Sequence, residues 1–345
     1  MTVYALFRPA LFRLDAEEAH GLALHFLQTM AGFAPRPVTS PRLATTVAGL
    51  DFPNPLGMAP GFDKDAAVPD ALMRIGFGFA EIGTVTPLPQ KGNPKPRLFR
   101  LVEDRAVINR MGFNNAGLDA ARKRLEARRG KSGVVGANIG ANKDSTDRVA
   151  DYATMAAALA PLASYLTINI SSPNTPGLRA LQDEGALGEL LDAVIEGRGT
   201  AKTPLFLKLA PDLLPADIDA ICRIALDRKL DALIVSNTTI ERPRLESRHA
   251  GEAGGLSGAP LKAMALQRLR DFRSASGGAI PLIGVGGIAT AGEAYERIRA
   301  GASLIQLYSA MVYEGPGIAR VITRGLDKLL ERDGFANVAA AVGVG

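Results

Sequence analysis

The sequence predicts an α/β fold, namely a (β/α)8 TIM barrel with a small N-terminal helical extension. Three observations predict it. Eight short apolar runs rich in β-branched residues recur along the chain, helical patterns separate most of them, and a unit of about 42 residues with helical periodicity precedes the first run. Runs that can be buried on both faces are typical of parallel strands, and eight such βα units are typical of a barrel. A doubly wound sheet is the weaker alternative because it usually has fewer strands.

The elements follow in order along the chain. Strands are expected at residues 55–58, 79–83, 134–138, 165–169, 205–208, 232–235, 281–285 and 304–307, and helices at residues 66–75, 154–162, 188–196, 216–227, 262–274 and 291–299. Two connections are long. The first, residues 84–133, contains a basic helix that reaches Arg129. The second, residues 238–258, is polar, and we interpret this second connection as a lid or cover loop. The tail after Gly334 is compatible with disorder, and we assign it no role.

Composition limits the possible functions. The chain has 345 residues, of which 47% are hydrophobic and 22% charged, as in a soluble protein with a sizeable core. Its single cysteine, Cys222, excludes a disulfide framework and any multi-cysteine metal site. The net charge of +5 mildly favours anionic partners, and no basic run predicts nucleic-acid binding. No stretch reaches the roughly 18 uncharged apolar residues that a transmembrane helix needs.

The N-terminal unit, residues 1–42, is expected to be separate from the barrel, residues 43–345. Its apolar residues repeat at helical spacing; they are Ala19, Leu22, Ala23, Phe26, Leu27 and Met30. This pattern permits two interpretations. The helices could cover one end of the barrel, or they could form an interfacial pair that meets a membrane. Spacing alone does not separate the two.

The residues just past the expected strands are mostly polar. They are Lys64, Thr84, Asn138, Asn169, Ser171, Ser172, Lys208, Ser236, Asn237, Gly286, Gly287, Tyr308 and Ser309. In a barrel of this type the active site lies at the carboxyl ends of the strands. The set is rich in amides and lysines and has no histidine or carboxylate cluster, so we expect no metal site and no Ser-His-Asp triad. Such groups suit a planar, partly anionic cofactor that supplies the chemistry itself.

A glycine run, Gly284-Val-Gly-Gly287, follows the seventh expected strand. It precedes a helix that Thr290 and Glu293 open with a capping-box pattern. Backbone amides and a helix N-terminus can bind phosphate, and barrels often bind phosphate after strands seven and eight. A tight βα turn would explain the glycines equally well in isolation. The position after strand seven favours a phosphate site.

Nine ordered motifs resemble those of dihydroorotate dehydrogenases. They are NPLGMAPGFDK (54–64), EIGTVTP (81–87), KPRLFR (95–100), NRMGFNN (109–115), NISSPNTPG (169–177), KLAPD (208–212), SNTT (236–239), GGLSG (254–258) and GVGG (284–287). They span essentially the whole expected barrel. One departure stands in the first motif, where Pro60 replaces a small residue of many relatives and removes a backbone donor.

The resemblance implies FMN as cofactor and dihydroorotate as substrate. The implied flavin-binding residues are Gly61, Lys64, Thr84, Asn138, Asn169, Lys208, Ser236, Gly258, Gly287, Tyr308 and Ser309. The implied substrate-binding residues are Lys64, Asn109, Phe113, Asn169, Asn174, Asn237 and Thr238. Ser172 occupies the position of the catalytic base, which is a cysteine in class 1 enzymes and a serine in class 2 enzymes.

Serine at position 172 implies class 2, whose members carry an N-terminal helical extension at the quinone entrance. The resemblance thus implies oxidation of dihydroorotate to orotate in pyrimidine biosynthesis, with electrons passed through FMN to a membrane quinone. It also implies peripheral membrane association through residues 1–42, at the cytoplasmic face of the inner membrane. The alternatives are a class 1 type enzyme that uses fumarate or NAD, a redox-neutral flavin barrel, and a non-catalytic protein that binds a phosphate ligand.

Overall fold

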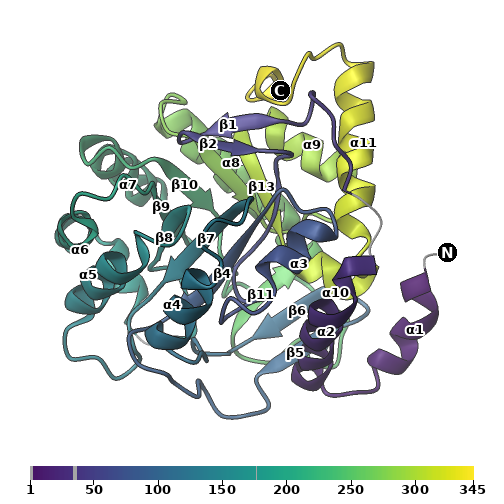
Figure 1. Cartoon of the computed structure of the whole chain (residues 1–345), viewed down its shortest axis with the longest axis horizontal. Helices are drawn as coiled ribbons and strands as arrows, with labels where there is room; N and C mark the ends of the chain where they lie inside the picture. Colours follow the sequence, from purple (N-terminus) through teal and green to yellow (C-terminus); the bar gives the residue numbers. More distant parts are fainter. Residues whose placement is uncertain (1–2, 34–36, 176) are drawn as a thin grey trace.

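Eight parallel strands close into a barrel in the order β10–β12–β13–β3–β4–β7–β8–β9, which confirms the predicted fold (Figure 1). They are β3 (Leu56–Met58), β4 (Phe79–Val85), β7 (Val134–Ile139), β8 (Tyr165–Asn169), β9 (Leu205–Leu209), β10 (Ala232–Val235), β12 (Leu282–Val285) and β13 (Ala302–Leu307). The computed structural model describes residues 3–33, 37–175 and 177–345. Residues 1–2 and 34–36 of the N-terminal unit, and Pro176 of the NISSPNTPG motif, lie outside the described residues.

Aromatic rings fill the amino-terminal end of the barrel. Phe79, Tyr165 and Phe206 stand at or near the starts of β4, β8 and β9 and are fully buried, and the rings of Tyr165 and Phe206 stack with centroids 4.4 Å apart. A hairpin of β1 (Thr45–Val47) and β2 (Leu50–Phe52), which was not predicted, places Phe52 edge-on to Phe79 at 5.1 Å. Because this end is packed with apolar rings, space for a ligand remains at the carboxyl ends of the strands.

Helices cover the outside of the barrel. They are α3 (Pro69–Arg74), α4 (Leu118–Glu126), α5 (Arg148–Leu159), α6 (Glu184–Arg198), α7 (Pro215–Asp227), α8 (Lys262–Ala275), α9 (Ala291–Arg299) and α11 (Ile318–Arg332). The short helix α10 (Ser309–Glu314) instead begins directly after β13, at the carboxyl end of that strand. The predicted capping box opens α9: the Glu293 N–H donates to Thr290 Oγ1 (3.2 Å), and the Thr290 N–H donates to the Glu293 carboxylate (3.0 Å). Helix α3 begins later than expected because the Asp63 carboxylate holds the N–H groups of Ala67 and Val68 in a turn.

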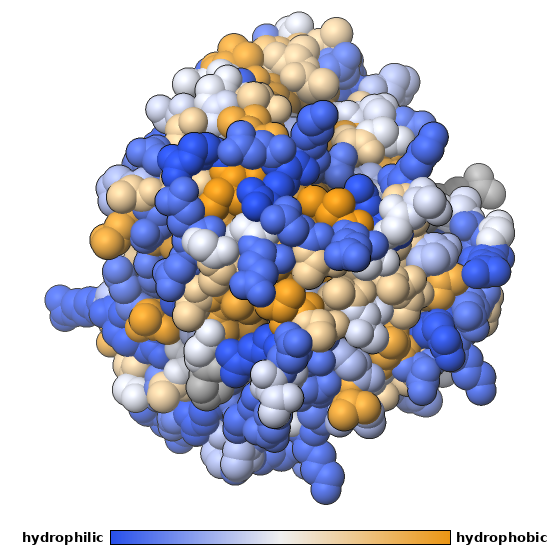
Figure 2. Space-filling view, turned by 90° about the vertical axis from the view of Figure 1, so that its left-hand side faces the viewer, coloured by the Kyte–Doolittle hydropathy of each residue, from blue (hydrophilic) through white to orange (hydrophobic). Residues whose placement is uncertain are grey.

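Helix α5 begins at Arg148, earlier than expected, because Asp147 caps it and accepts the N–H of Ala150 at 2.9 Å. Figure 2 shows the side of the molecule that carries α5, α6 and α7. Hydrophilic residues cover most of this face, and hydrophobic residues appear in separate groups. This distribution is the one expected of barrel helices that bury one stripe and expose the other.

The N-terminal unit is a helical pair, which confirms the predicted extension. Helix α1 (Val3–Leu11) and helix α2 (Ala16–Met30), continued by η1 (Ala31–Phe33), lie beside α10 at the right of Figure 1. The Tyr4 hydroxyl ties α1 to α10 by donating to the carbonyl of Val312 at 2.6 Å. Leu6, Phe7 and Phe33 are 66%, 61% and 82% exposed. Of the helices described, none is long and apolar enough to cross a membrane.

A second, three-stranded sheet stands over the barrel mouth and was not predicted. It consists of β5 (Leu98–Leu101), β6 (Ala106–Asn109) and β11 (Gly255–Gly258), with β6 in the centre and both pairings antiparallel. The expected cover loop at residues 238–258 is therefore wrong at its end, where four residues form β11. Leu101, Ile108 and Leu256 form a separate small core beneath this sheet. This core joins the long connection of residues 84–133 to the cover segment of residues 238–258.

The tail after Gly334 is ordered against the barrel, contrary to the expectation of disorder. It contains a 3-10 turn, η4 (Ala339–Ala341), and buries Val338 and Ala341 completely. The Val338 N–H donates to the carbonyl of Arg42 at 2.8 Å. Two buried apolar side chains and a backbone hydrogen bond hold this tail in place. The tail consists mainly of small residues without a clear periodic pattern, so its sequence did not predict these contacts.

Candidate active site

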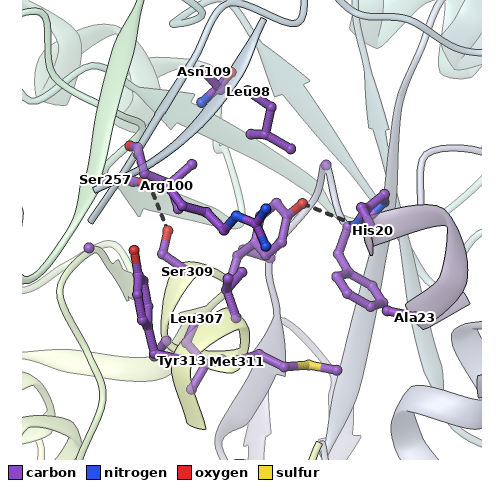
Figure 3. A pocket seen from close by; sticks show the side chains of 18 of the residues that line it. His20, Ala23, Leu98, Arg100, Asn109, Ser257, Leu307, Ser309, Met311 and Tyr313 are labelled. Atoms are coloured by element: carbon purple, nitrogen blue, oxygen red, sulfur yellow. Dashed lines mark hydrogen bonds between the residues drawn. The ribbon is translucent and has the colours of Figure 1, made fainter. Parts of the chain in front are cut away.

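A cavity of about 1600 Å³ lies at the carboxyl ends of the barrel strands and extends between the three-stranded sheet, α10 and the N-terminal helices (Figure 3). All predicted site residues except Asn138 line it. They are Gly61, Lys64, Thr84, Asn109, Phe113, Asn169, Ser172, Asn174, Lys208, Ser236, Asn237, Thr238, Gly258, Gly287, Tyr308 and Ser309. Residues that are up to 248 positions apart (309 minus 61) thus meet around one space.

Asn138 lies one layer below the cavity. Its side-chain oxygen accepts hydrogen bonds from Thr84 Oγ1 (2.5 Å) and Asn169 Nδ2 (3.0 Å), and its amide donates to Glu81 (2.8 Å). Glu81 is fully buried inside the barrel and also accepts hydrogen bonds from Tyr165 (3.0 Å) and Gln306 (2.7 Å). Asn138 therefore fixes the orientation of two cavity residues from behind, and a buried carboxylate fixes Asn138.

Lys208 supplies a buried positive charge to the cavity. Its side chain is 5% exposed, and burial lowers its pKa, while the Glu81 carboxylate acts in the opposite direction. Within the described part of the chain, no hydrogen-bond partner acts on its ammonium group, and Glu81 acts on it only through space. A buried ammonium group with three free donors is costly unless a ligand supplies acceptor atoms. Lys208 therefore fits a planar ligand with oxygen or nitrogen acceptors at its edge.

Lys64 provides a second cation on the opposite wall. Its Nζ donates to Asn114 Oδ1 at 2.6 Å. Burial lowers its pKa to about 8, and the Glu17 carboxylate partly opposes this shift. Because the charged form is only moderately favoured at neutral pH, the charge of Lys64 is sensitive to what binds beside it.

Ser172 faces the cavity from the loop that follows β8. Its side chain is almost buried, and its Oγ accepts the N–H of Asn174 at 3.3 Å. The Asn174 amide donates to Asn109 Oδ1 at 3.0 Å, which joins this loop to the end of β6. Among the described residues, no titratable side chain is hydrogen-bonded to Ser172. The hydroxyl proton is therefore free to point into the cavity.

The expected phosphate end lies between β12 and α10. The capping box of α9 uses the N–H groups of Ala289, Thr290 and Glu293, because Glu293 accepts the first two and Thr290 accepts the third. The phosphate site expected beside this helix therefore stays a prediction, and the glycine loop offers further donors for it. In the described structure the amides of Gly286 and Gly287 donate to no acceptor. Across the cavity Ser309 shares a hydrogen bond of 2.7 Å with Ser257, drawn dashed in Figure 3.

The N-terminal side of the cavity contains residues that the motif analysis did not single out. Figure 3 shows His20 and Ala23 of α2 on one side and Arg100 of β5 reaching across the centre, above Tyr313 of α10. Burial lowers the pKa of His20 to about 4, with Lys64 as the next cause, so the imidazole is neutral at physiological pH. Arg100 lies 4.8 Å from the centroid of the Phe12 ring. The KPRLFR motif contains Arg100 and was the only signal for it.

An ion pair connects α2 to the loop beside the substrate motifs. Arg97, 7% exposed, donates from Nε (3.0 Å) and Nη2 (2.6 Å) to the two oxygens of Glu17. Its Nη1 donates to the carbonyls of Lys91 and Asn93. The Asn93 amide in turn donates to the carbonyl of Asn174 at 3.2 Å. A bidentate, largely buried pair of this kind fixes geometry strongly, so the N-terminal unit is joined to the Ser172 loop.

Comparisons with known proteins agree with this geometry. The family model described as dihydroorotate dehydrogenase matches residues 42–330. Two relatives named dihydroorotate dehydrogenase (quinone), from Novosphingobium aromaticivorans and Erythrobacter litoralis, are 68% and 65% identical, and each match covers 99% of both chains. The crystal structure of DHODH from Eimeria tenella in complex with ferulenol has a TM-score of 0.91 and 40% identity, covering 97% of this chain and 98% of that chain. The chain therefore belongs to the dihydroorotate dehydrogenase family, in its quinone-dependent class.

Proposed function

We propose that this cavity oxidises dihydroorotate to orotate, a step of pyrimidine biosynthesis, and that the electrons pass to a quinone. The observation that carries the proposal is the convergence of two buried lysines, an asparagine set and Ser172 on one cavity that α1 and α2 also line. Relatives that share about two thirds of the residues over the full length bear the name of this activity. A non-catalytic phosphate-binding protein would have no use for Lys64, Ser172 and the asparagine set, Ser172 and the N-terminal unit speak against a class 1 type enzyme, and a redox-neutral flavin barrel would consume no external acceptor.

Flavin dependence is general in this family, and we propose FMN as the flavin. A flavin supplies the acceptor for the hydride that the substrate loses. The lining fits it: Lys208 offers donors for the edge of a flavin ring, and the free amides of Gly286 and Gly287 offer donors for a phosphate. Gly61 has a φ of +98° and keeps the wall bare beside the Tyr308 ring, which a Cβ would touch at 3.7 Å. The flavin-binding residues proposed are those that the motifs implied, with Asn138 acting from below the cavity through Thr84 and Asn169.

Ser172 is the proposed base. Dihydroorotate must lose a proton from C5 and a hydride from C6, and the Ser172 hydroxyl would accept the proton. Serine is a weak base, so its own proton must leave through water or a neighbouring group. Lys64 and the asparagines at positions 109, 174 and 237 would hold the substrate and stabilise negative charge that develops on it. Phe113, Asn169 and Thr238 complete the proposed substrate set.

We further propose that quinone enters between α1 and α2, and that this unit rests on a membrane at the cytoplasmic face of the inner membrane. The exposed side chains of Leu6, Phe7 and Phe33 support this, because large apolar groups gathered on a helical pair favour an interface with lipid. Arg8 and Arg13 on the same unit would favour anionic headgroups. Sedimentation of the protein with anionic phospholipid vesicles tests this association.

An anaerobic titration tests the proposed function. Adding dihydroorotate to the flavin-loaded protein is expected to bleach the visible absorbance of the oxidised flavin, and adding a quinone is expected to restore it. Bleaching without recovery would contradict the quinone assignment and point to fumarate or NAD as acceptor. An unbleached flavin would contradict the substrate assignment.

Lys64 makes orotate binding dependent on pH. Its pKa of about 8 means that the free site loses this positive charge as the pH rises through about 8. If the anionic ligand needs the charged form, the Kd of orotate is expected to be flat below this pH and to rise by up to about tenfold per unit above it. Perturbation of the flavin absorbance by orotate measures this Kd. A Lys64→Arg variant keeps its charge and should show a flat profile, and a flat profile in the unaltered protein would contradict the assignment.

A further inference from the structure

Arg297 of α9 is a cation buried directly behind the glycine loop. Its side chain is 1% exposed and is the largest fully buried side chain in the described chain. Its Nη2 donates to the carbonyls of Lys262 (2.7 Å) and Gly286 (2.9 Å). Its Nε and Nη1 are buried and lack any hydrogen-bond partner. A buried guanidinium with unpaired donors is an uncommon and costly arrangement.

No carboxylate among the described residues forms an ion pair or a hydrogen bond with Arg297. The nearest acidic groups act on Arg297 only through space: Glu296 and Glu293 stabilise its charge, and Arg270 opposes it. Glu293 is already engaged by Lys262 (3.2 Å) and by the first turn of α9. Burial lowers the pKa of Arg297 to about 10, so the side chain is still charged at neutral pH. The counter-charge is therefore expected to come from a bound anion.

The geometry of the glycine loop says where such an anion would lie. In a trans peptide the carbonyl and the following N–H point in opposite directions. Because the Gly286 carbonyl accepts from Arg297, the Gly287 N–H points away from Arg297, and both glycines line the cavity. Gly286 and Gly287 have φ values of +109° and +68°, and a Cβ on Gly287 would lie 2.5 Å from Cα of Lys262. At Gly286 and Gly287 the wall between Arg297 and the cavity therefore carries no side chain of its own.

We propose that Arg297 is a positioning residue for the phosphate of the bound flavin: it fixes the peptide between Gly286 and Gly287 with its N–H toward the cavity and places a positive charge behind it. This inference rests on the proposed function, because it takes FMN as the flavin. Arg297 does not contact the phosphate. It acts through the glycine loop, and its charge strengthens the hydrogen bonds that the loop donates.

Comparing FMN with riboflavin, which lacks the phosphate, tests the proposal. The full chain is dialysed to equilibrium against a series of concentrations of each flavin, and the bound flavin is measured. Arg297→Met is expected to weaken FMN binding by about 10- to 100-fold, as expected for hydrogen bonds to a charged group, and to leave riboflavin binding within about twofold. Arg297→Lys should restore most of the preference because it keeps one charged donor.

Arg299→Met is the matched control. It removes the same charge from the same helix, but Arg299 donates to the carbonyl of Val344 near the C-terminus instead of the glycine loop. The preference of the Arg299→Met variant for FMN over riboflavin should equal that of the unaltered protein. Equal losses of FMN and riboflavin binding in Arg297→Met would overturn the proposal in favour of a purely structural role, and so would an unchanged preference. If the unaltered protein does not prefer FMN over riboflavin, the proposed cofactor itself fails, which is a separate result.

Discussion

Replacing Ser172 with alanine is expected to slow the reduction of the bound flavin by dihydroorotate about 10²- to 10⁴-fold, the usual contribution of a general base. The hydroxyl faces the cavity and accepts only a weak hydrogen bond from the Asn174 N–H, so its loss removes the proton acceptor and little structure. The flavin content should stay unchanged. Anaerobic stopped-flow absorbance at the flavin band measures the rate without any quinone.

Ser172→Cys serves as the control for this prediction. A thiol of similar size keeps a proton-accepting group in the same place, and its lower pKa should move the pH profile of flavin reduction toward lower pH. Activity that returns with a shifted profile would identify the group at this position as the base. A Ser172→Ala variant whose flavin is reduced by dihydroorotate at the normal rate would exclude Ser172 as the base.

The barrel was predictable because its signals are local. Each strand is a short, continuous apolar run, and the pairing of neighbouring strands follows from the βα order. The three-stranded sheet was not predictable in the same way. Its strand β11 pairs with β6 so that Ser257 lies opposite Val107, and residues so far apart in sequence leave no periodic signal of their pairing. GGLSG therefore appeared to be part of a polar loop.

The site was predictable where its residues stand at strand ends or in motifs. The sequence did not indicate how far each of these side chains lies from the cavity surface. Asn138 follows the same pattern as Asn169 but lies below the cavity, because its amide is directed to Glu81 inside the barrel. His20 and Tyr313 were also missed, since their place in the cavity depends on how the N-terminal helices pack beside α10. Such packing follows from tertiary contacts that no local pattern encodes.

The N-terminal unit is better tested by a point substitution than by deletion. Deleting it would remove Glu17 and leave Arg97, whose side chain is 7% exposed, without its bidentate partner. An unpaired and largely buried guanidinium is destabilising, and Arg97 also holds the loop that contacts Asn174. Loss of activity after deletion could then reflect damage at the substrate end as well as loss of the quinone entrance.

Ala23→Trp is expected to obstruct the proposed quinone entrance. Ala23 lines the cavity from α2, on the same side as His20 in Figure 3. A large indole at this position should fill part of the space beside the helices, because it projects far more volume into the cavity than the methyl group of alanine. Quinone-dependent turnover should fall to the rate without added quinone. Anaerobic flavin reduction by dihydroorotate should be unchanged, because Ala23 belongs to the N-terminal unit and not to the proposed substrate-binding residues.

Gln28→Trp is the matched control, since Gln28 lies on the same helix but is exposed and does not line the cavity. It adds the same apolar group without filling the entrance and should keep full quinone turnover. Quinone-dependent turnover and anaerobic flavin reduction report on the two half-reactions separately, so together they show which half-reaction the substitution affects. If Ala23→Trp turns over quinone normally, electrons leave by another route and the N-terminal pair has only a structural role. If it loses both half-reactions, the substitution has disturbed the Glu17–Arg97 connection, and the two ends of the cavity are coupled through α2.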